Sequence, residues 1–165
     1  MKVAGERDPA SFGEYFASFR RKIFESGSSH EIQGDLAGAV DVALESRTIA
    51  DSTRMVDGAI DVKVREGTTI ANGPREGGRF FVEDKAGESF DPKQAKFYSD
   101  KLDSGTLKTS DPGTAKGLIY FVEDPAHAET IAGKLKGLNE NIFVATFGAD
   151  GKIEFVPRPA KVAKD

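Results

Sequence analysis

The residues best suited to chemistry are a glutamate and a lysine, Glu83 and Lys85, at the end of the apolar run RFFVEDK. Side chains alternate between the two faces of a β-strand, so Glu83 and Lys85 share one face and Asp84 points to the other. The preceding β-rich segment contains Asp57 and Asp61, which are four positions apart and therefore also share a face. A hairpin could bring one of these aspartates beside Glu83.

Two carboxylates beside an amine have a defined chemical use. They can hold a hard divalent cation such as Mg²⁺, or Mn²⁺ in its place, and leave coordination positions for water and a phosphate oxygen. The cation would activate the attacking water, and Lys85 would orient that water and stabilise the developing negative charge. The residues thus predict phosphodiester hydrolysis. Whether Asp57 or Asp61 supplies the second carboxylate depends on the hairpin register and stays open.

The competing interpretation is a solvated surface charge pair, which would contribute less than ~1 kcal/mol. The context favours a site, because the pair ends an apolar strand, follows an acidic strand and precedes a helix that contains Gln94. His30 and His127 are the only histidines and are far apart, and there is no cysteine. A thiolate nucleophile and a histidine-rich metal centre are therefore excluded, and any metal must depend on carboxylates.

The net charge of −4 weighs against nucleic-acid binding, although a basic face can coexist with it. Lys93, Lys96, Lys101 and Lys108 are the candidates for such a face. No run of apolar residues is long enough for a membrane anchor, and the polar N-terminus shows no signal peptide. We therefore expect a soluble protein.

Periodicity predicts the elements that position these residues. Asp-Pro pairs at 91–92 and 124–125 mark two helix starts. The expected helices are 11–25, 34–47, 91–103 and 126–138, and the expected strands are 54–65, 79–85, 117–123, 141–147 and 152–156.

Strands that alternate with helices after an initial hairpin predict an α/β fold, a three-layer α/β/α sandwich with a mixed central sheet. The length of 165 residues suits a single domain. We expect that domain at 11–156, between flexible ends at 1–10 and 157–165.

Residues 54–98 resemble the core of the PD-(D/E)XK, or restriction-endonuclease-like, nuclease superfamily, and especially its versions in bacterial polymorphic toxins. The resemblance rests on three motifs: Arg54-Met-Val-Asp57, Glu83-Asp-Lys85-Ala-Gly87, and Gln94 followed by Phe97 and Tyr98. It implies a restriction-endonuclease-like fold in which Asp57 and Glu83 bind Mg²⁺, Lys85 is catalytic and Gln94 contacts substrate or water. An acidic residue on the preceding helix often adds a ligand, and Glu45 is the candidate here.

The resemblance further implies a DNase, the toxin domain of an antibacterial effector. Such a domain would be delivered into the cytoplasm of a target cell and neutralised by a cognate immunity protein. Two alternatives remain. The net charge and Asp84 favour a non-catalytic α/β binding module, such as an immunity or adaptor protein, and the same fold could act on RNA.

Overall fold

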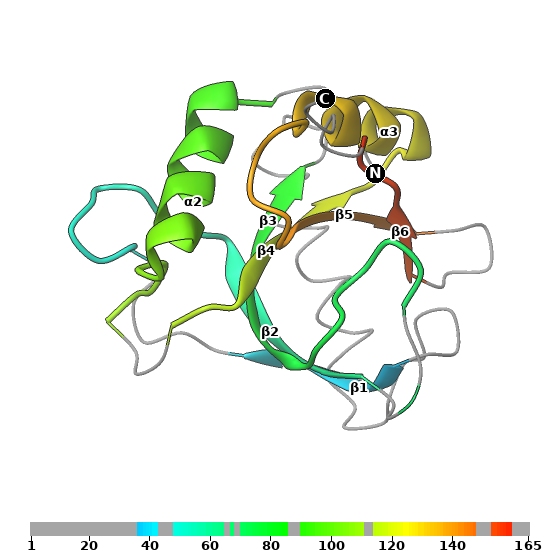
Figure 1. The fold of residues 1–165 in the computed structure, drawn as a ribbon, viewed down its shortest axis with the longest axis horizontal. Coiled ribbons are helices and arrows are strands. Elements are labelled where there is room, and N and C mark those ends of the chain that lie inside the picture. The colour runs from blue at the N-terminus through cyan, green and yellow to red at the C-terminus, as the bar shows by residue number, and fades with distance from the viewer. Residues whose placement is uncertain are drawn as a thin grey trace, which may run out of the picture.

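A computed structural model describes residues 36–42, 48–64, 67, 70–85, 90–110, 114–147 and 153–159. These residues form an α/β domain with one curled mixed sheet and two helices (Figure 1). The strands are ordered β1-β2-β3-β4-β5-β6, with β3, β4 and β5 parallel and every other neighbouring pair antiparallel. The elements are β1 (Leu36–Val42), β2 (Gly58–Val64), β3 (Gly78–Lys85), α2 (Pro92–Ser104), β4 (Gly117–Val122), α3 (Pro125–Lys134), β5 (Ile142–Phe147) and β6 (Ile153–Val156).

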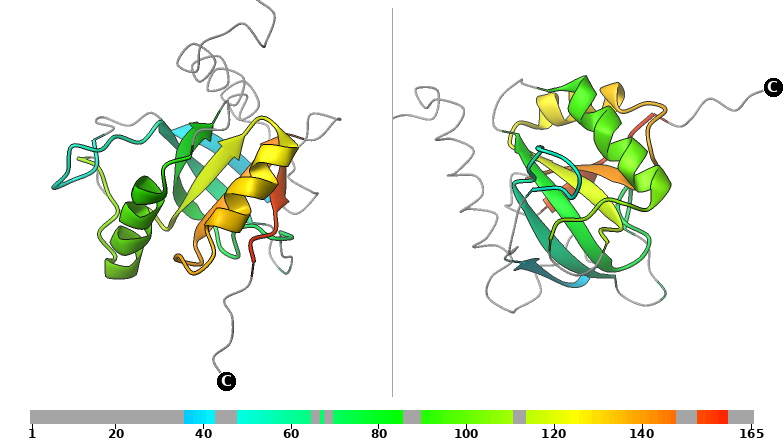
Figure 2. Two further views of the ribbon diagram at one scale, coloured as in Figure 1. Left: turned by 90° about the horizontal axis from the view of Figure 1, so that it is seen from above. Right: turned by 90° about the vertical axis from the view of Figure 1, so that its left-hand side faces the viewer.

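The two helices lie on the same face of the sheet (Figure 2). This follows from two successive crossovers, β3-α2-β4 and β4-α3-β5, that advance in one direction across the sheet, because such connections are right-handed. The expected α/β class and mixed sheet are confirmed. The expected helix at 11–25 lies outside the described residues, so the three-layer arrangement and the restriction-endonuclease-like fold stay predictions.

The helix expected at 34–47 is wrong over its first half. Residues Leu36–Val42 form β1, which pairs antiparallel with β2 in a register that places Val40 opposite Asp61. Leu36 and Val40 have helical spacing, but β-branched Val40 and Val42 also suit a strand, and pairing with β2 satisfies the backbone. Glu45, the ligand candidate on that expected helix, lies outside the described residues.

Strand β2 begins at Gly58, four residues later than expected. The preceding segment turns at residues 50–53, with a bridge between Thr48 and Met55 and a hydrogen bond from Ile49 N to the Arg54 carbonyl at 2.8 Å. The later strands match the expected ones to within a residue, and α3 ends four residues early, at Lys134.

Each helix begins as its Asp-Pro pair predicts. The Asp91 carboxylate accepts from Lys93 N at 2.9 Å, and Asp124 accepts from Ala126 N at 3.0 Å. Helix α2 ends at Gly105, whose φ of 70° lies in the left-handed region that glycine adopts without strain. These caps determine where the first turn of α2 lies, next to the end of β3. Neither described helix is long and apolar enough to cross a membrane.

The alternation of side chains divides the core between the two faces of the sheet. Phe81 and Tyr120 pack with α2 and α3 in one cluster, whereas Phe80, Val82 and Phe121 belong to a second cluster on the opposite face. Strand β4 contributes side chains to both clusters, because all six of its residues are buried and successive side chains point to opposite faces of the sheet. Glu83 follows the first set and therefore points under α2.

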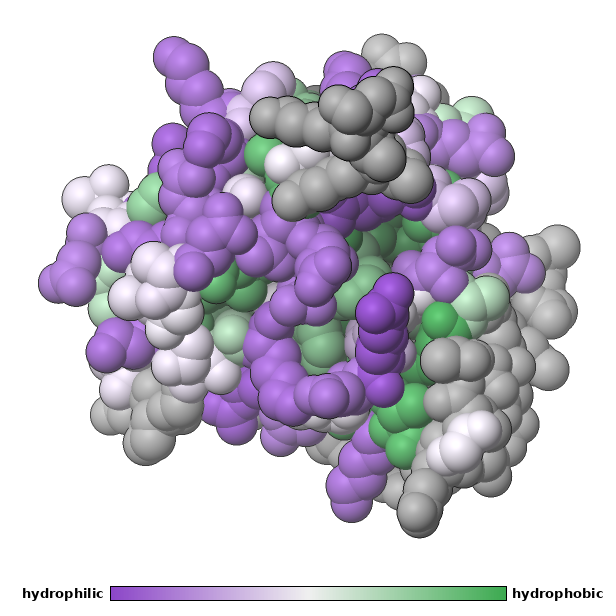
Figure 3. Space-filling model, in the orientation of Figure 1, coloured by the Kyte–Doolittle hydropathy of each residue, from purple (hydrophilic) through white to green (hydrophobic). Residues whose placement is uncertain are grey.

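A cavity of about 550 Å³ lies at the N-terminal end of β5, and Glu83 is not among the residues that line it. It opens on the face drawn in Figure 3, where a hollow has hydrophobic side chains at its base and hydrophilic ones around it. Arg158 lines this cavity, but its terminal nitrogens donate to the carbonyls of Leu135, Leu138, Asn139 and Ile142 at 2.6–3.0 Å. Arg158, which belongs to the expected C-terminal tail, is thus hydrogen-bonded to the segment between α3 and β5.

Arg158→Met should lower the free energy of unfolding by about 2–4 kcal/mol, because it leaves half-buried carbonyls without donors. Urea denaturation would measure the change. The matched control is Arg75→Met at the rim of the same cavity, because Arg75 is exposed and should change stability by no more than about 0.5 kcal/mol. Equal effects of the two substitutions would contradict this account of Arg158.

Candidate active site at the end of strand β3

The candidate site forms where β3 ends beneath the first turns of α2. Glu83 is 3% exposed and pairs in register with Tyr120 on the parallel strand β4. Both side chains point to the face that α2 covers, as the alternation predicts. A carboxylate at the carboxyl end of a parallel strand occupies the edge where α/β proteins bind ligands.

Asp57 lies beside Glu83. Its backbone N–H contacts both the Val82 carbonyl at 3.0 Å and Glu83 Oε2 at 3.2 Å. Its own carboxylate accepts from the backbone N–H of Asp84 at 2.8 Å, so it is held against the end of β3 from the other strand of the hairpin. Asp57 is exposed and Glu83 is buried, so the two carboxylates form a site with one open and one closed side.

Asp61 is not part of this arrangement. The hairpin register places it opposite Arg79, and its Oδ1 contacts Arg79 Nε at 3.2 Å. Four residues of strand separate it from Asp57, which is roughly 13 Å. Of the two aspartates that the sequence left open, Asp57 is therefore the one near Glu83.

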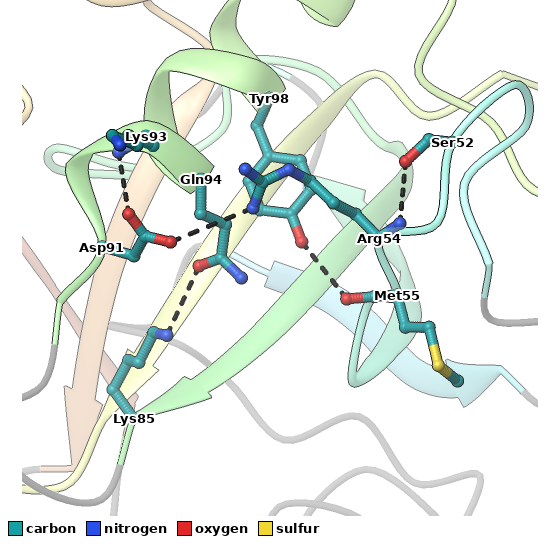
Figure 4. A network of polar contacts seen from close by, with 8 residues as sticks. All are labelled: Ser52, Arg54, Met55, Lys85, Asp91, Lys93, Gln94 and Tyr98. Carbon is teal, nitrogen blue, oxygen red and sulfur yellow. Dashed lines mark hydrogen bonds and ion pairs between the residues drawn. The ribbon is translucent and has the colours of Figure 1, made fainter.

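Lys85 and Gln94 meet above the carboxylates. Lys85 extends from the end of β3 toward the first turn of α2, where its Nζ donates to Gln94 Oε1 at 3.4 Å (Figure 4). The same nitrogen lies 5.9 Å from the centre of the Tyr120 ring. Gln94 therefore holds the lysine over the site, and the three motifs of the sequence converge on one corner of the fold.

The electrostatics of Glu83 reflect this crowding. Burial, and then the nearby Asp57 carboxylate, raise the pKa of Glu83 from 4.5 to about 8, against smaller opposing effects of Lys85, Tyr98 and the Asp57 backbone. Ionising Glu83 in the metal-free protein is thus unfavourable. A cation between the two carboxylates would remove the repulsion and favour the ionised form.

Two tyrosines join the site. Tyr98 belongs to the motif that begins at Gln94, whereas Tyr120 was seen in the sequence only as part of an apolar run. The Tyr98 hydroxyl hydrogen bonds to the Glu83 carboxylate, and it also lies 3.5 Å from the Met55 carbonyl. The Tyr120 hydroxyl is buried and has no hydrogen-bond partner among the described residues. Burial raises the pKa of both hydroxyls, so both remain neutral donors. For Tyr120 the only signal in the sequence was a phenol at a position where a hydrocarbon side chain would suffice.

Cationic side chains lie on the outer surface of α2. Arg54 lies 3.9 Å from Asp91 (Figure 4). Its guanidinium is also 5.2 Å from the centre of the Phe97 ring. Lys101 approaches the same ring at 5.7 Å, whereas Lys96 is paired with Asp100 at 2.6 Å. The expected basic face is therefore partly neutralised, and Arg54, the first residue of one motif, adds a cation beside the start of α2.

The carboxylates of the site suit a cation that keeps part of its hydration shell better than a cation that is coordinated by protein atoms alone. Among the described residues, no group of three or more acidic, histidine or cysteine side chains could hold a metal. Asp57 and Glu83 provide two carboxylates, which is the usual protein contribution to Mg²⁺, a cation that keeps several waters. The unpartnered Tyr120 hydroxyl and the repulsion between the Glu83 and Asp57 carboxylates are consistent with a hydrated Mg²⁺ at this position.

Comparisons of the chain with protein-family models, with curated proteins and with solved structures found no match.

Proposed function

We propose that this protein is a metal-dependent nuclease that hydrolyses DNA phosphodiester bonds, with Mg²⁺ as its cation and Mn²⁺ as a substitute. The observation that carries the proposal is the meeting of two carboxylates beneath an amine positioned by Gln94: Glu83 on β3, and Asp57, the residue before β2. The raised pKa of Glu83 supports it, because perturbed carboxylates gather at functional sites.

Each residue has a role that follows from its position. Asp57, on the open side of the site, and Glu83, on its buried side, would hold the cation. When bound, Mg²⁺ supplies charge neutralisation at phosphorus and a lower pKa for the attacking water. Lys85 donates to the negative charge that develops on the phosphate oxygens, and Gln94 keeps the lysine in place. Tyr98 orients the Glu83 carboxylate.

Calorimetric titration with Mg²⁺ tests the cation site directly. Asp57→Asn should weaken binding at least tenfold, because a carboxylate ligand becomes a neutral amide. Asp61→Asn is the matched control and should bind as the wild type does, since Asp61 interacts with Arg79 elsewhere on β2. A flat titration of the wild-type protein, or equal losses in the two variants, would contradict the proposed site.

The biological setting is a proposal that rests on the resemblance of the three motifs to toxin nucleases. The domain would act in the cytoplasm of a target bacterium after delivery, and an immunity protein would bind and neutralise it. Co-expression would test this, because toxicity should require Glu83 and a neighbouring gene product should relieve it.

Two other functions compete with DNA hydrolysis. The net charge of −4 and the partial neutralisation of the α2 lysines favour a non-catalytic binding module. RNA would be an alternative substrate for the same chemistry. Incubation with both polymers and Mg²⁺ separates the cases: a module degrades neither, and a preference between the polymers identifies the substrate.

A further inference from the structure

Tyr120 lies buried beside Glu83 in the candidate site. This side chain is fully buried, yet its oxygen has no hydrogen-bond partner among the described residues. Buried polar groups are nearly always paired, because an unpaired one loses its hydration without compensation. Phenylalanine at this position would avoid that cost, so the hydroxyl calls for a physical explanation.

The position of Tyr120 provides one. It lies next to Glu83 in the parallel register of β3 and β4, under the Lys85 amine and against the Phe90 ring at 5.9 Å. The carboxylates of Glu83 and Asp91 both act on its hydroxyl electrostatically. Asp91 is the cap of α2, so the hydroxyl faces the junction between that helix start and the end of β3.

We propose that Tyr120 is a positioning residue of the cation site, whose hydroxyl donates to a water molecule of the divalent cation's hydration shell near Glu83. The inference rests on the proposed function and deepens it. A group as buried as Tyr120 cannot meet a phosphate ester directly, so its hydroxyl would act through a water molecule that the cation holds. Mg²⁺ retains several waters when it binds to proteins, and each needs an acceptor or donor in the second layer of contacts.

Tyr98 provides a matched control. It is also fully buried and also faces Glu83, but its hydroxyl is partnered by that carboxylate. Removing the Tyr98 hydroxyl deprives a buried acceptor of its donor, whereas removing the Tyr120 hydroxyl deprives no described residue of a bond. The two substitutions by phenylalanine are chemically identical and should have opposite effects on stability.

The first measurement is thermal unfolding in EDTA. Tyr120→Phe should leave the melting temperature unchanged or raise it by about 2–4 °C, because an uncompensated polar group is removed. Tyr98→Phe should lower it by a similar amount. If Tyr120→Phe lowers the melting temperature as much as Tyr98→Phe does, the hydroxyl has a structural partner and the inference is overturned.

The second measurement is Mg²⁺ affinity by calorimetry, which needs no substrate. Tyr120→Phe should weaken binding by about tenfold, the loss expected for one hydrogen bond to a group polarised by charge. Wild-type affinity in Tyr120→Phe would overturn the inference and would leave the proposed function intact if wild-type protein binds Mg²⁺ and cleaves DNA. Absence of Mg²⁺ binding by the wild-type protein would overturn both.

Discussion

Glu83→Gln should reduce Mg²⁺-dependent cleavage of DNA by roughly 10³-fold or more, because it removes the buried ligand charge at the centre of the site. Glutamine preserves the size of the side chain, so the loss would report on charge and not on packing. Lys85→Met should cost about 10²–10³-fold, as expected when one donor to a developing negative charge is lost. Rates of degradation of linear DNA, measured with increasing Mg²⁺, give both values.

The controls for this experiment come from the same hairpin. Asp61→Asn changes a carboxylate on β2 that interacts with Arg79, and it should retain the wild-type rate. EDTA should abolish DNA cleavage by the wild-type protein and by every active variant. Full activity of Glu83→Gln or of Lys85→Met would reject the catalytic assignment and leave a binding module as the better description.

The stability of the metal-free protein should fall as the pH rises from about 4.5 to about 8. Folded Glu83 has the higher pKa, so the native state binds more protons than the unfolded state in this window, and raising the pH favours unfolding. The free energy of unfolding should fall by up to about 1.4 kcal/mol per pH unit, and by at most about 5 kcal/mol over the whole window. Urea denaturation in EDTA at successive pH values measures it.

Glu83→Gln is the decisive comparison, because it has no carboxyl to titrate. This variant should lose the pH dependence over that window and should be more stable than the wild-type protein near pH 8 in EDTA. Mg²⁺ should restore the stability of the wild-type protein at that pH, because the cation binds the ionised Glu83 carboxylate and displaces the proton that the metal-free folded state retains. Parallel pH profiles of the variant and the wild-type protein would show that Glu83 is not the group responsible.

Much of the fold around the site could be predicted from local patterns. The alternation in RFFVEDK placed Glu83 and Lys85 on the face of Phe81, and that face is covered by α2. The Asp-Pro pairs located the starts of both described helices, because a capping carboxylate and a fixed φ act within a few residues. Gln94, in the first turn of α2, was assigned to the site by the resemblance of the motifs and not by these local patterns.

The errors came from segments in which local patterns were ambiguous. Residues Leu36–Val42 allow helical spacing and strand propensity together, and the strand prevails because β2 offers its edge for pairing. Asp57 and Asp61 share a face in sequence, so only the pairing of Gly58 with Val82 and of Asp61 with Arg79 could separate them. Register depends on contacts across the hairpin and is not encoded in either strand alone.

The sequence by itself determined which groups are available for chemistry: two acids, an amine and an amide, with no thiol and no histidine cluster. Tertiary structure decided which of them meet and in what protonation state. Asp57, Tyr98 and Tyr120 reach Glu83 from three different elements, and the raised pKa of that carboxyl arises from burial and from the neighbouring Asp57 charge. Both effects depend on distances across the fold, which the order of residues along one strand does not specify.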